Sequence, residues 1–128
     1  MRLLALDTNV LIAFLRNPGA FADRFADFDQ IVLSPVVLGE YRAGLFDTKV
    51  GKANRKVLEE YLRNPAVRVL AMTDRTSAVY AKVFQSLRKR GAPIPTNDMW
   101  IAAAALENGA ALATDDGHFA VVEMLQIV

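Results

Sequence analysis

Residues 97–119 read NDMWIAAAALENGAALATDDGHF, a stretch in which a long apolar segment is followed by a short one and then by two adjacent acids. After its first turn, the segment Asn97–Asn108 is apolar nearly all round, which predicts a helix buried in the middle of the fold. Gly109 stands where the C-terminal glycine of a helix belongs. The run Ala111–Ala113 is short and apolar, as a strand covered on both faces is. A buried helix followed by a buried strand favours an α/β fold.

Short apolar runs alternate with longer segments of helical period along the rest of the chain, with no linker, repeat or low-complexity stretch. This alternation predicts an α/β sandwich around a parallel sheet. We expect strands at Leu3–Leu6, Ile31–Leu33, Val67–Leu70 and Ala111–Ala113, with a candidate last strand at Leu125–Val128. We expect helices at Thr8–Arg16, Ala20–Phe28, Pro35–Phe46, Lys52–Arg63, Arg75–Arg90 and Asn97–Asn108.

Several of these helices have recognisable ends. Ser34 before Pro35 is a preferred N-cap, and Thr73 or Asp74 can cap the fifth helix. Thr96 is the expected cap of the sixth helix. The expected C-terminal glycines are Gly91 and Gly109.

The composition excludes several classes of protein. With 128 residues we expect one domain over residues 1–128, and 53% hydrophobic against 23% charged residues is too apolar for disorder. No apolar run is long enough for a membrane helix, and the start MRLLALD lacks the features of a secretory signal, so we expect a soluble cytoplasmic protein. The absence of cysteine excludes disulfides, thiolate zinc sites and cysteine nucleophiles. The formal charge of +1 neither demands nor forbids a nucleic-acid partner.

Three of the fourteen acidic residues lie within three positions after the end of an expected strand. Asp7 ends LLALD, and Asp115 and Asp116 follow the strand ALA. The carboxyl ends of parallel strands form the edge where open α/β sheets bind ligands. Each position also has an ordinary interpretation, because Asp7 suits a helix N-cap and one acid of the doublet suits a turn with Gly117.

Two further acids lie in apolar surroundings. Glu40 lies in PVVLGEYRAGLF, so we expect a partly buried side chain that needs a partner, and Arg42 is too close in sequence to share its helical face. Asp98 is at the start of the buried helix, where the helix dipole stabilises an acid. An exposed position in the first turn is the alternative for Asp98.

Together these acids predict a cation site. If the first and fourth strands are neighbours, Asp7, Asp98 and the acidic doublet crowd one end of the sheet, and Glu40 reaches in from its helix. Two carboxylates about 4 Å apart repel by about 4 kcal/mol at an effective dielectric constant near 20. Carboxylate and water oxygens are the ligands that Mg²⁺ and Mn²⁺ favour.

The chain resembles the PIN-domain ribonucleases, and more narrowly the VapC-like toxins of bacterial and archaeal toxin-antitoxin pairs. The resemblance rests on LALDTNVLIAFL, SPVVLGEYRAG, PTNDMWIAAAALENGAAL and LATDDGHF, and it spans nearly the whole chain. It implies a PIN-like three-layer α/β/α sandwich with a short, mainly parallel sheet of four to five strands. It also implies a metal-dependent endoribonuclease that hydrolyses RNA phosphodiester bonds and leaves a 5′-phosphate and a 3′-hydroxyl.

The resemblance also implies roles for individual residues. The residues of the implied catalytic and metal site, for Mg²⁺ or Mn²⁺, are Asp7, Glu40, Asp98 and Asp116. Whether Glu40 is a ligand or orients the attacking water stays open. The polar residues expected to hydrogen-bond the carboxylates or bound water are Thr8 or Asn9, and Thr114.

The last motif of the family is a threonine, a variable residue, an aspartate, two variable residues and a phenylalanine. Laid on LATDDGHF, it places Asp116 in the metal site and leaves Asp115 at a variable position. We interpret Asp115 as a surface charge, with an outer contact to metal or antitoxin as the alternative. His118 is the only histidine, which excludes a metal-free paired-histidine ribonuclease. We interpret it as a loop or surface residue, with a phosphate contact as the alternative.

RNA binding also needs cations along the path of the substrate. The candidate RNA contacts are Arg42, Lys49 and Lys52. Lys49 and Lys52 belong to a basic run that also holds Arg55 and Lys56, and a second basic run covers residues 88–90. Solvated helix faces are the alternative for these runs, and a structural ion pair is the alternative for Arg42.

The resemblance implies three kinds of partner: an RNA substrate, an antitoxin whose C-terminal segment covers the acids, and a second copy of the chain in a homodimer or larger toxin-antitoxin assembly. No membrane partner is expected. Three alternatives stay open: a PIN-like nuclease outside a toxin-antitoxin pair, a phosphotransfer domain, and a non-catalytic α/β module whose acidic pocket receives a basic peptide. A haloacid-dehalogenase phosphatase, one phosphotransfer candidate, wants an acid two positions after its nucleophile, where Asn9 stands.

Overall fold

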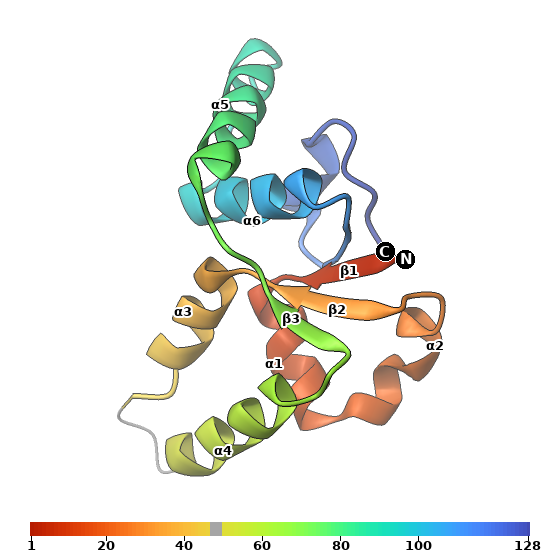
Figure 1. Cartoon of the computed structure of the whole chain (residues 1–128). Coiled ribbons are helices and arrows are strands. Elements are labelled where there is room, and N and C mark those ends of the chain that lie inside the picture. Colours follow the sequence, from red (N-terminus) through yellow and green to blue (C-terminus); the bar gives the residue numbers. More distant parts are fainter. Residues whose placement is uncertain (47–49) are drawn as a thin grey trace.

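A parallel sheet lies at the centre of the structure, a computed structural model that describes residues 1–46 and 50–128 (Figure 1). In these residues the strands are β1 (Leu3–Leu6), β2 (Gln30–Leu33), β3 (Val67–Val69) and β4 (Ala111–Ala113). Their order is β3-β2-β1-β4, and all three pairings are parallel. The four strands expected from the sequence are confirmed to within one residue at each end.

Strand β1 lies between β2 and β4, which confirms that the first and fourth strands are neighbours. Leu6 is opposite Ala113 in the β1–β4 register. The next residue, Asp7, continues the ladder with one more bond, because its N–H donates to the carbonyl of Ala113 at 3.2 Å. The segments after β1 and β4 therefore leave the sheet side by side.

The candidate last strand at Leu125–Val128 is wrong as a strand, because this segment forms only an isolated bridge between Leu112 and Ile127. The amide of Leu112 donates to the Gln126 carbonyl, and the amide of Val128 donates to the Leu112 carbonyl, both at 2.9 Å. Just before it, the backbone of Met124 has a φ of 68°, which interrupts extended structure. The chain end is thus tied to β4 without extending the sheet.

Helices cover both faces of the sheet (Figure 1). Helices α5 and α6 lie on one side, and α1, α3 and α4 lie on the other, which gives the three-layer α/β/α sandwich. The helices are α1 (Thr8–Arg16), α2 (Ala22–Phe25), α3 (Pro35–Ala43), α4 (Gly51–Leu62), α5 (Asp74–Lys89) and α6 (Thr96–Glu107), with 3₁₀ turns η1 (Pro18–Phe21) and η2 (Gly117–Val121). None of the described helices is both long and apolar enough to span a membrane.

Two expected helices are shorter than predicted. Instead of one helix over Ala20–Phe28, the chain forms η1 and the single turn α2, whose rings pack on Phe14 at centroid distances of 5.8 Å for Phe21 and 5.1 Å for Phe25. Packing of these aromatic rings in the folded protein overrides the local preference for one continuous helix. Helix α3 ends at Ala43 rather than Phe46, because the amides of Leu45 and Phe46 bond carbonyls three residues back in tighter turns.

Most expected helix ends are confirmed. Ser34 accepts the amide of Val37 at 3.2 Å, and Thr73 forms a capping box with Thr76. Gly91 and Gly109 follow their helices with φ of 64° and 65°, a conformation that glycine adopts without a steric cost.

The expected cap at Thr96 is wrong. Pro95 occupies the N-cap position of α6, and Thr96 is the first helical residue. Since proline has no side-chain oxygen, the start of α6 has no side-chain cap bond. The first turn of α6 instead carries Asp98, an acid suited to that end of the helix dipole.

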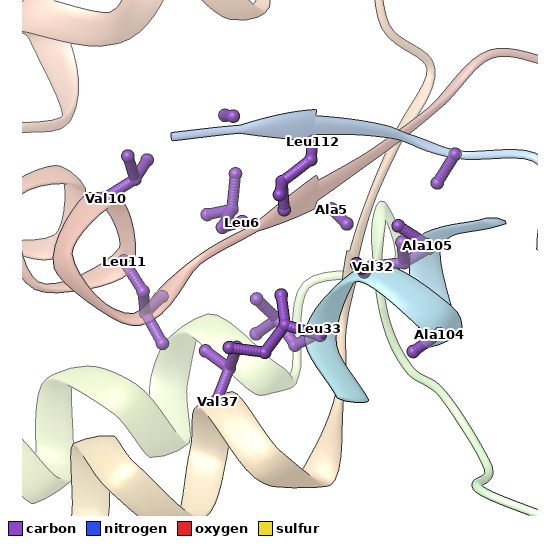
Figure 2. Close-up of a cluster of buried hydrophobic side chains, with 14 of the residues drawn as sticks. Ala5, Leu6, Val10, Leu11, Val32, Leu33, Val37, Ala104, Ala105 and Leu112 are labelled. Carbon is purple, nitrogen blue, oxygen red and sulfur yellow. The ribbon is translucent and has the colours of Figure 1, made fainter. Parts of the chain in front are cut away.

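Helix α6 packs into the core, as its apolar sequence predicts. Residues 102–105 are alanines that are at most 2% exposed, so the helix backbone can approach the sheet closely. The close-up in Figure 2 shows strand, α1, α3 and α6 side chains meeting in one cluster. Labelled members are Ala5, Leu6, Val10, Leu11, Val32, Leu33, Val37, Ala104, Ala105 and Leu112.

Candidate metal centre

Asp7 is at the junction of β1 and α1 and is only 4% exposed. Its Oδ1 accepts the amide of Val10 at 2.8 Å, which caps α1, and its Oδ2 accepts the hydroxyl of Thr114. Burial raises the pKa of the Asp7 carboxyl, and the charges of Asp115 and Asp116 add to this, while the two hydrogen bonds oppose it. Asp7 is thus a helix cap and also a buried acid in a field of negative charge.

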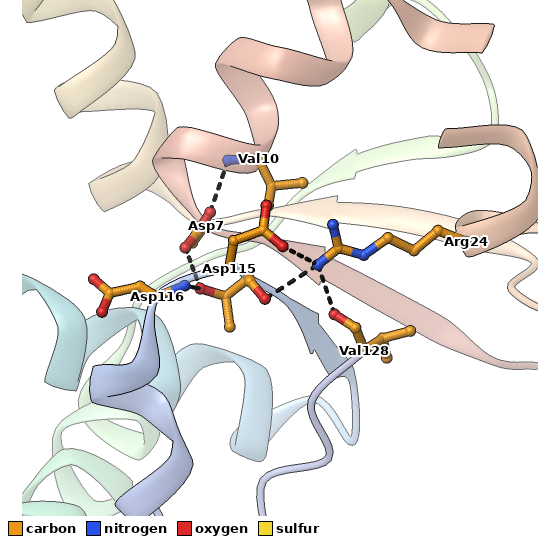
Figure 3. A network of polar contacts seen from close by, with 7 residues as sticks. Asp7, Val10, Arg24, Asp115, Asp116 and Val128 are labelled. Atoms are coloured by element: carbon orange, nitrogen blue, oxygen red, sulfur yellow. Dashed lines mark hydrogen bonds and ion pairs between the residues drawn. The ribbon is translucent and has the colours of Figure 1, made fainter. Parts of the chain in front are cut away.

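Thr114 joins the ends of β1 and β4. Its hydroxyl donates to Asp7 and accepts the amide of Asp116 at 2.9 Å (Figure 3). Asp116 Oδ1 accepts the amide of His118 at 2.9 Å and so caps η2, and Phe119 is buried beneath the turn. The spacing of LATDDGHF therefore fixes the backbone that carries Asp116.

Asp98 lies in the first turn of α6 with its side chain 19% exposed. Burial raises the pKa of its carboxyl, and the charges of Asp116 and Glu40 raise it further, against the opposing effect of His118. Asp98 is therefore close enough to both acids to feel their charge. The exposed alternative for Asp98 does not hold, because the side chain is partly buried.

His118 lies between two of the acids. Its Nδ1 is 3.2 Å from Asp116 Oδ1 and 3.4 Å from Asp98 Oδ2. One ligand atom from each of these three side chains lies within 4.8 Å of the others. The side chain is 55% exposed on a short turn, as a loop residue is expected to be, but its contact with two acids was not foreseen. The sequence signal for this contact is that His118 lies only two residues after Asp116.

Glu40 is exposed, so the expected partial burial is wrong. The buried face of α3 is formed by other residues, Val37, Leu38 and Tyr41. Glu40 does have partners: the Thr8 hydroxyl donates to Oε1 at 2.7 Å, and Asn97 Nδ2 donates to Oε2 at 3.4 Å.

These two bonds connect α3 to the starts of α1 and α6. Thr8 was expected to support a carboxylate, and it does so at Glu40. Asn97 was not foreseen. Asn9 is exposed and forms no hydrogen bond to the four acids in the described residues.

Asp115 points away from the other acids. Its side chain is 76% exposed and pairs with Arg24 at 3.1 Å (Figure 3). Arg24 also donates to the carbonyls of Thr114 at 3.1 Å and Val128 at 2.7 Å. Arg24 therefore ties α2 to the end of β4 and to the chain end. No local pattern marked it, since these partners are 90 or more positions away in sequence.

The candidate RNA contacts lie outside this network. Arg42 and Lys52 are exposed on α3 and α4, and Lys49 lies outside the described residues. In residues 1–46 and 50–128, neither Arg42 nor Lys52 forms an ion pair with an acid.

The donor set fits a divalent cation. Two of the acids have raised pKa values because they are buried near other carboxylates, and a cation relieves both effects. Within the described part of the chain, no lysine or arginine forms an ion pair with the four acids, which are Asp7, Glu40, Asp98 and Asp116. Carboxylate oxygens with one imidazole suit Mn²⁺ and, through the oxygens, Mg²⁺.

Comparison with known proteins agrees with this fold and arrangement. The family model described as PIN domain matches residues 4–124. Ribonuclease VapC1 from Haemophilus influenzae is 33% identical over 113 residues, covering 85% of this chain and 83% of the relative. The structure of VapBC-1 from nontypeable Haemophilus influenzae aligns with a TM-score of 0.84 and 29% identity, covering 98% of this chain and 96% of that one.

A second solved structure is VapBC-5 from Mycobacterium tuberculosis, described as a member of the VapBC family of toxin-antitoxin systems. It aligns with a TM-score of 0.78 and 26% identity, covering 100% of this chain and 98% of that one. The match of the family model over most of the chain and the identity to a curated relative lead to the same assignment. The chain belongs to the PIN domain family, and within that family it is similar to the VapC ribonucleases.

Proposed function

We propose that this chain is a divalent-metal-dependent endoribonuclease and the toxin of a toxin-antitoxin pair. The observation that carries the proposal is the carboxylate cluster at the carboxyl edge of β1 and β4. There Thr114 bonds the side chain of Asp7 and the backbone of Asp116, and Asp116 raises the pKa of Asp98. The similarity to a protein named ribonuclease VapC1 supports RNA as the substrate.

Asp7, Asp98 and Asp116 would hold Mg²⁺ or Mn²⁺, directly or through water. A bound divalent cation lowers the pKa of a coordinated water and offsets negative charge that develops on the phosphoryl oxygens. The products would be a 5′-phosphate and a 3′-hydroxyl.

The other polar residues of the site keep the carboxylates in place. Thr114 holds the buried carboxylate of Asp7 in one orientation. Glu40 is more exposed and is oriented by Thr8 and Asn97, a position suited either to a ligand or to a group that orients the attacking water.

The substrate would approach along exposed cations of α3 and α4. Arg42 follows Glu40 by two residues on α3, and Lys52 is in the first turn of α4. We assign them to phosphate contacts that grip the RNA backbone without reading its sequence, and Lys49 is proposed for the same role from the sequence alone.

The proposed protein partner is an antitoxin that covers the acids with a basic side chain. A cleft of about 210 Å³ borders Glu40 between α1, α3 and α4, and its lining includes the apolar side chains of Ile12, Leu15 and Val57. An apolar segment carrying one cation would fit both the cleft and the acids beside it. The similarity to VapBC-5, described as a toxin-antitoxin system, supports this partner. We further propose a cytoplasmic homodimer that enters a larger assembly with the antitoxin.

An RNA cleavage assay on wild type and Asp7→Asn tests the catalytic assignment. Asparagine keeps an oxygen for the amide of Val10, so the variant removes the charge while preserving the helix cap. We expect cleavage by wild type with Mg²⁺ or Mn²⁺, 5′-phosphate ends on the products, no cleavage with excess chelator, and little cleavage by the variant. Equal cleavage by both proteins would contradict the catalytic assignment of Asp7, and no metal-dependent cleavage by wild type would favour a non-catalytic module.

A growth assay tests the toxin assignment. We expect expression of the chain to arrest growth, and co-expression of the product of the neighbouring gene to restore it. Growth that continues during expression of an active nuclease would place the protein outside a toxin-antitoxin pair.

A further inference from the structure

His118 is held in place by its backbone as well as by its ring. Its amide donates to Asp116 Oδ1 at 2.9 Å, and the next residue, Phe119, is 1% exposed and anchors the turn. The imidazole Nδ1 lies 3.2 Å from Asp116 Oδ1 and 3.4 Å from Asp98 Oδ2. The ring is therefore directed at two acids from different elements, α6 and the segment after β4.

These distances are those of neighbouring ligands around one ion. Ligands at right angles about an octahedral cation, each about 2.1 Å away, are about 3 Å apart. In the absence of an ion, the same distances allow Nδ1–H to donate to either carboxylate. A hydrogen bond and a shared metal ion therefore give similar nitrogen–oxygen distances, and detection of a bond between the metal and the nitrogen distinguishes them.

We propose that His118 Nδ1 is a direct ligand of the divalent cation held by Asp98 and Asp116, and that it biases the site toward Mn²⁺ over Mg²⁺. The inference rests on the proposed metal site and extends it from an all-oxygen set to a mixed set. Imidazole nitrogen suits first-row transition ions, whereas Mg²⁺ keeps oxygen ligands and water. With a side chain 55% exposed, the ring forms the outer wall of the site.

Pulsed electron paramagnetic resonance of the Mn²⁺-loaded protein tests this ligand directly. The chain has one histidine, so tag-free protein labelled with ¹⁵N only in histidine changes the nitrogen nucleus at His118 and nowhere else. We expect the modulation of a coordinated ¹⁴N imidazole in unlabelled protein and its replacement by the ¹⁵N pattern after labelling. This experiment uses the wild-type chain and does not depend on the folding of a variant.

The possible outcomes separate this inference from the proposed function. Bound Mn²⁺, detected as loss of the free-ion signal, without imidazole modulation would overturn the ligand role and leave the carboxylate site intact. Failure of Mn²⁺ to bind at all would overturn both. Modulation that changes with labelling supports the ligand role.

Metal affinities of His118→Ala test the bias between ions. We expect Mn²⁺ affinity to fall about tenfold or more and Mg²⁺ affinity to fall much less. Asp115→Asn is the matched control, because it removes a nearby charge that pairs with Arg24, and it should leave the ratio of the two affinities unchanged. Equal losses for both ions in His118→Ala would overturn the bias toward Mn²⁺.

Discussion

The hydroxyl of Thr114 donates to Asp7 Oδ2 across 107 positions of sequence, and its oxygen accepts the amide of Asp116. One buried side chain thus links the acid after β1 to the backbone of the acid after β4. The register of the two strands, with Leu6 opposite Ala113, places the linked residues at adjoining strand ends.

Replacing Thr114 with valine should destabilise the metal-free protein. Valine preserves the shape but leaves the buried Asp7 Oδ2 without its donor, and a buried group that loses its partner costs about 1–3 kcal/mol. Urea denaturation of wild type, Thr114→Val and Thr114→Ser measures the loss. The serine variant keeps the hydroxyl and should retain most of the stability. Equal losses in the two variants would assign the effect to packing rather than to the hydroxyl.

Asp98→Asn should separate metal binding from stability. In metal-free protein we expect unchanged or greater stability, because the variant removes a partly buried charge near Asp116 and Glu40. Mg²⁺ or Mn²⁺ should raise the melting temperature of wild type and no longer raise that of the variant. Thermal melts with and without metal measure both effects, with Glu59→Gln on the exposed face of α4 as control. A large loss in the metal-free variant would mean that Asp98 is a structural residue at the start of α6.

The stability gap between wild type and Asp98→Asn should depend on pH. Burial and the charge of Asp116 raise the pKa of Asp98 in the folded state, so the folded chain binds this proton more tightly than the unfolded chain does. The penalty for ionised Asp98 is full above the raised folded pKa. It disappears as the pH falls through that pKa toward the unfolded value of 3.8.

We therefore expect the variant to have the larger free energy of unfolding at about pH 7, and the two proteins to be equally stable near about pH 4. Urea titrations of the metal-free proteins across this range measure the gap. A variant that is less stable than wild type at about pH 7, and that loses this disadvantage on acidification, would mean that the folded pKa of Asp98 is lowered instead.

Arg24 and Asp115 should differ in their effect on stability although they form one ion pair. Arg24→Met removes two hydrogen bonds to backbone carbonyls, those of Thr114 and Val128, and should cost about 1–3 kcal/mol. Asp115→Asn removes only an exposed ion pair and should cost less than about 1 kcal/mol. Chemical denaturation of both variants provides the comparison. Similar losses of stability in the two variants would mean that the ion pair, and not the carbonyl contacts, keeps α2 against the end of β4.

The sequence predicted elements well where local pattern and burial agree. Helix α1 has the expected bounds, and the alanine-rich segment 102–105 identified the buried helix α6. The pattern failed at α2, where packing of Phe21 and Phe25 on Phe14 decides the backbone.

Asp7, Asp98 and Asp116 of the candidate site could be singled out from the sequence because they follow strands or begin a buried helix. The direction of a side chain at the rim could not be found in this way. Glu40 was expected to be partly buried from its apolar neighbours, yet it is exposed and bonded to Thr8 and Asn97. The sequence indicates that His118 is a loop residue, but it carries no information on which way the imidazole ring points.

Cleavage rates of Asp116→Asn and Asp115→Asn test the central claim most directly. The two acids are adjacent in sequence, but their side chains have different partners. Asp116 contacts His118, which also contacts Asp98, whereas Asp115 pairs with Arg24. We expect Asp116→Asn to lower metal-dependent RNA cleavage by about 10- to 100-fold or more, and Asp115→Asn to lower it only mildly. The opposite ranking would contradict the account, because it would place the metal at the other member of the doublet.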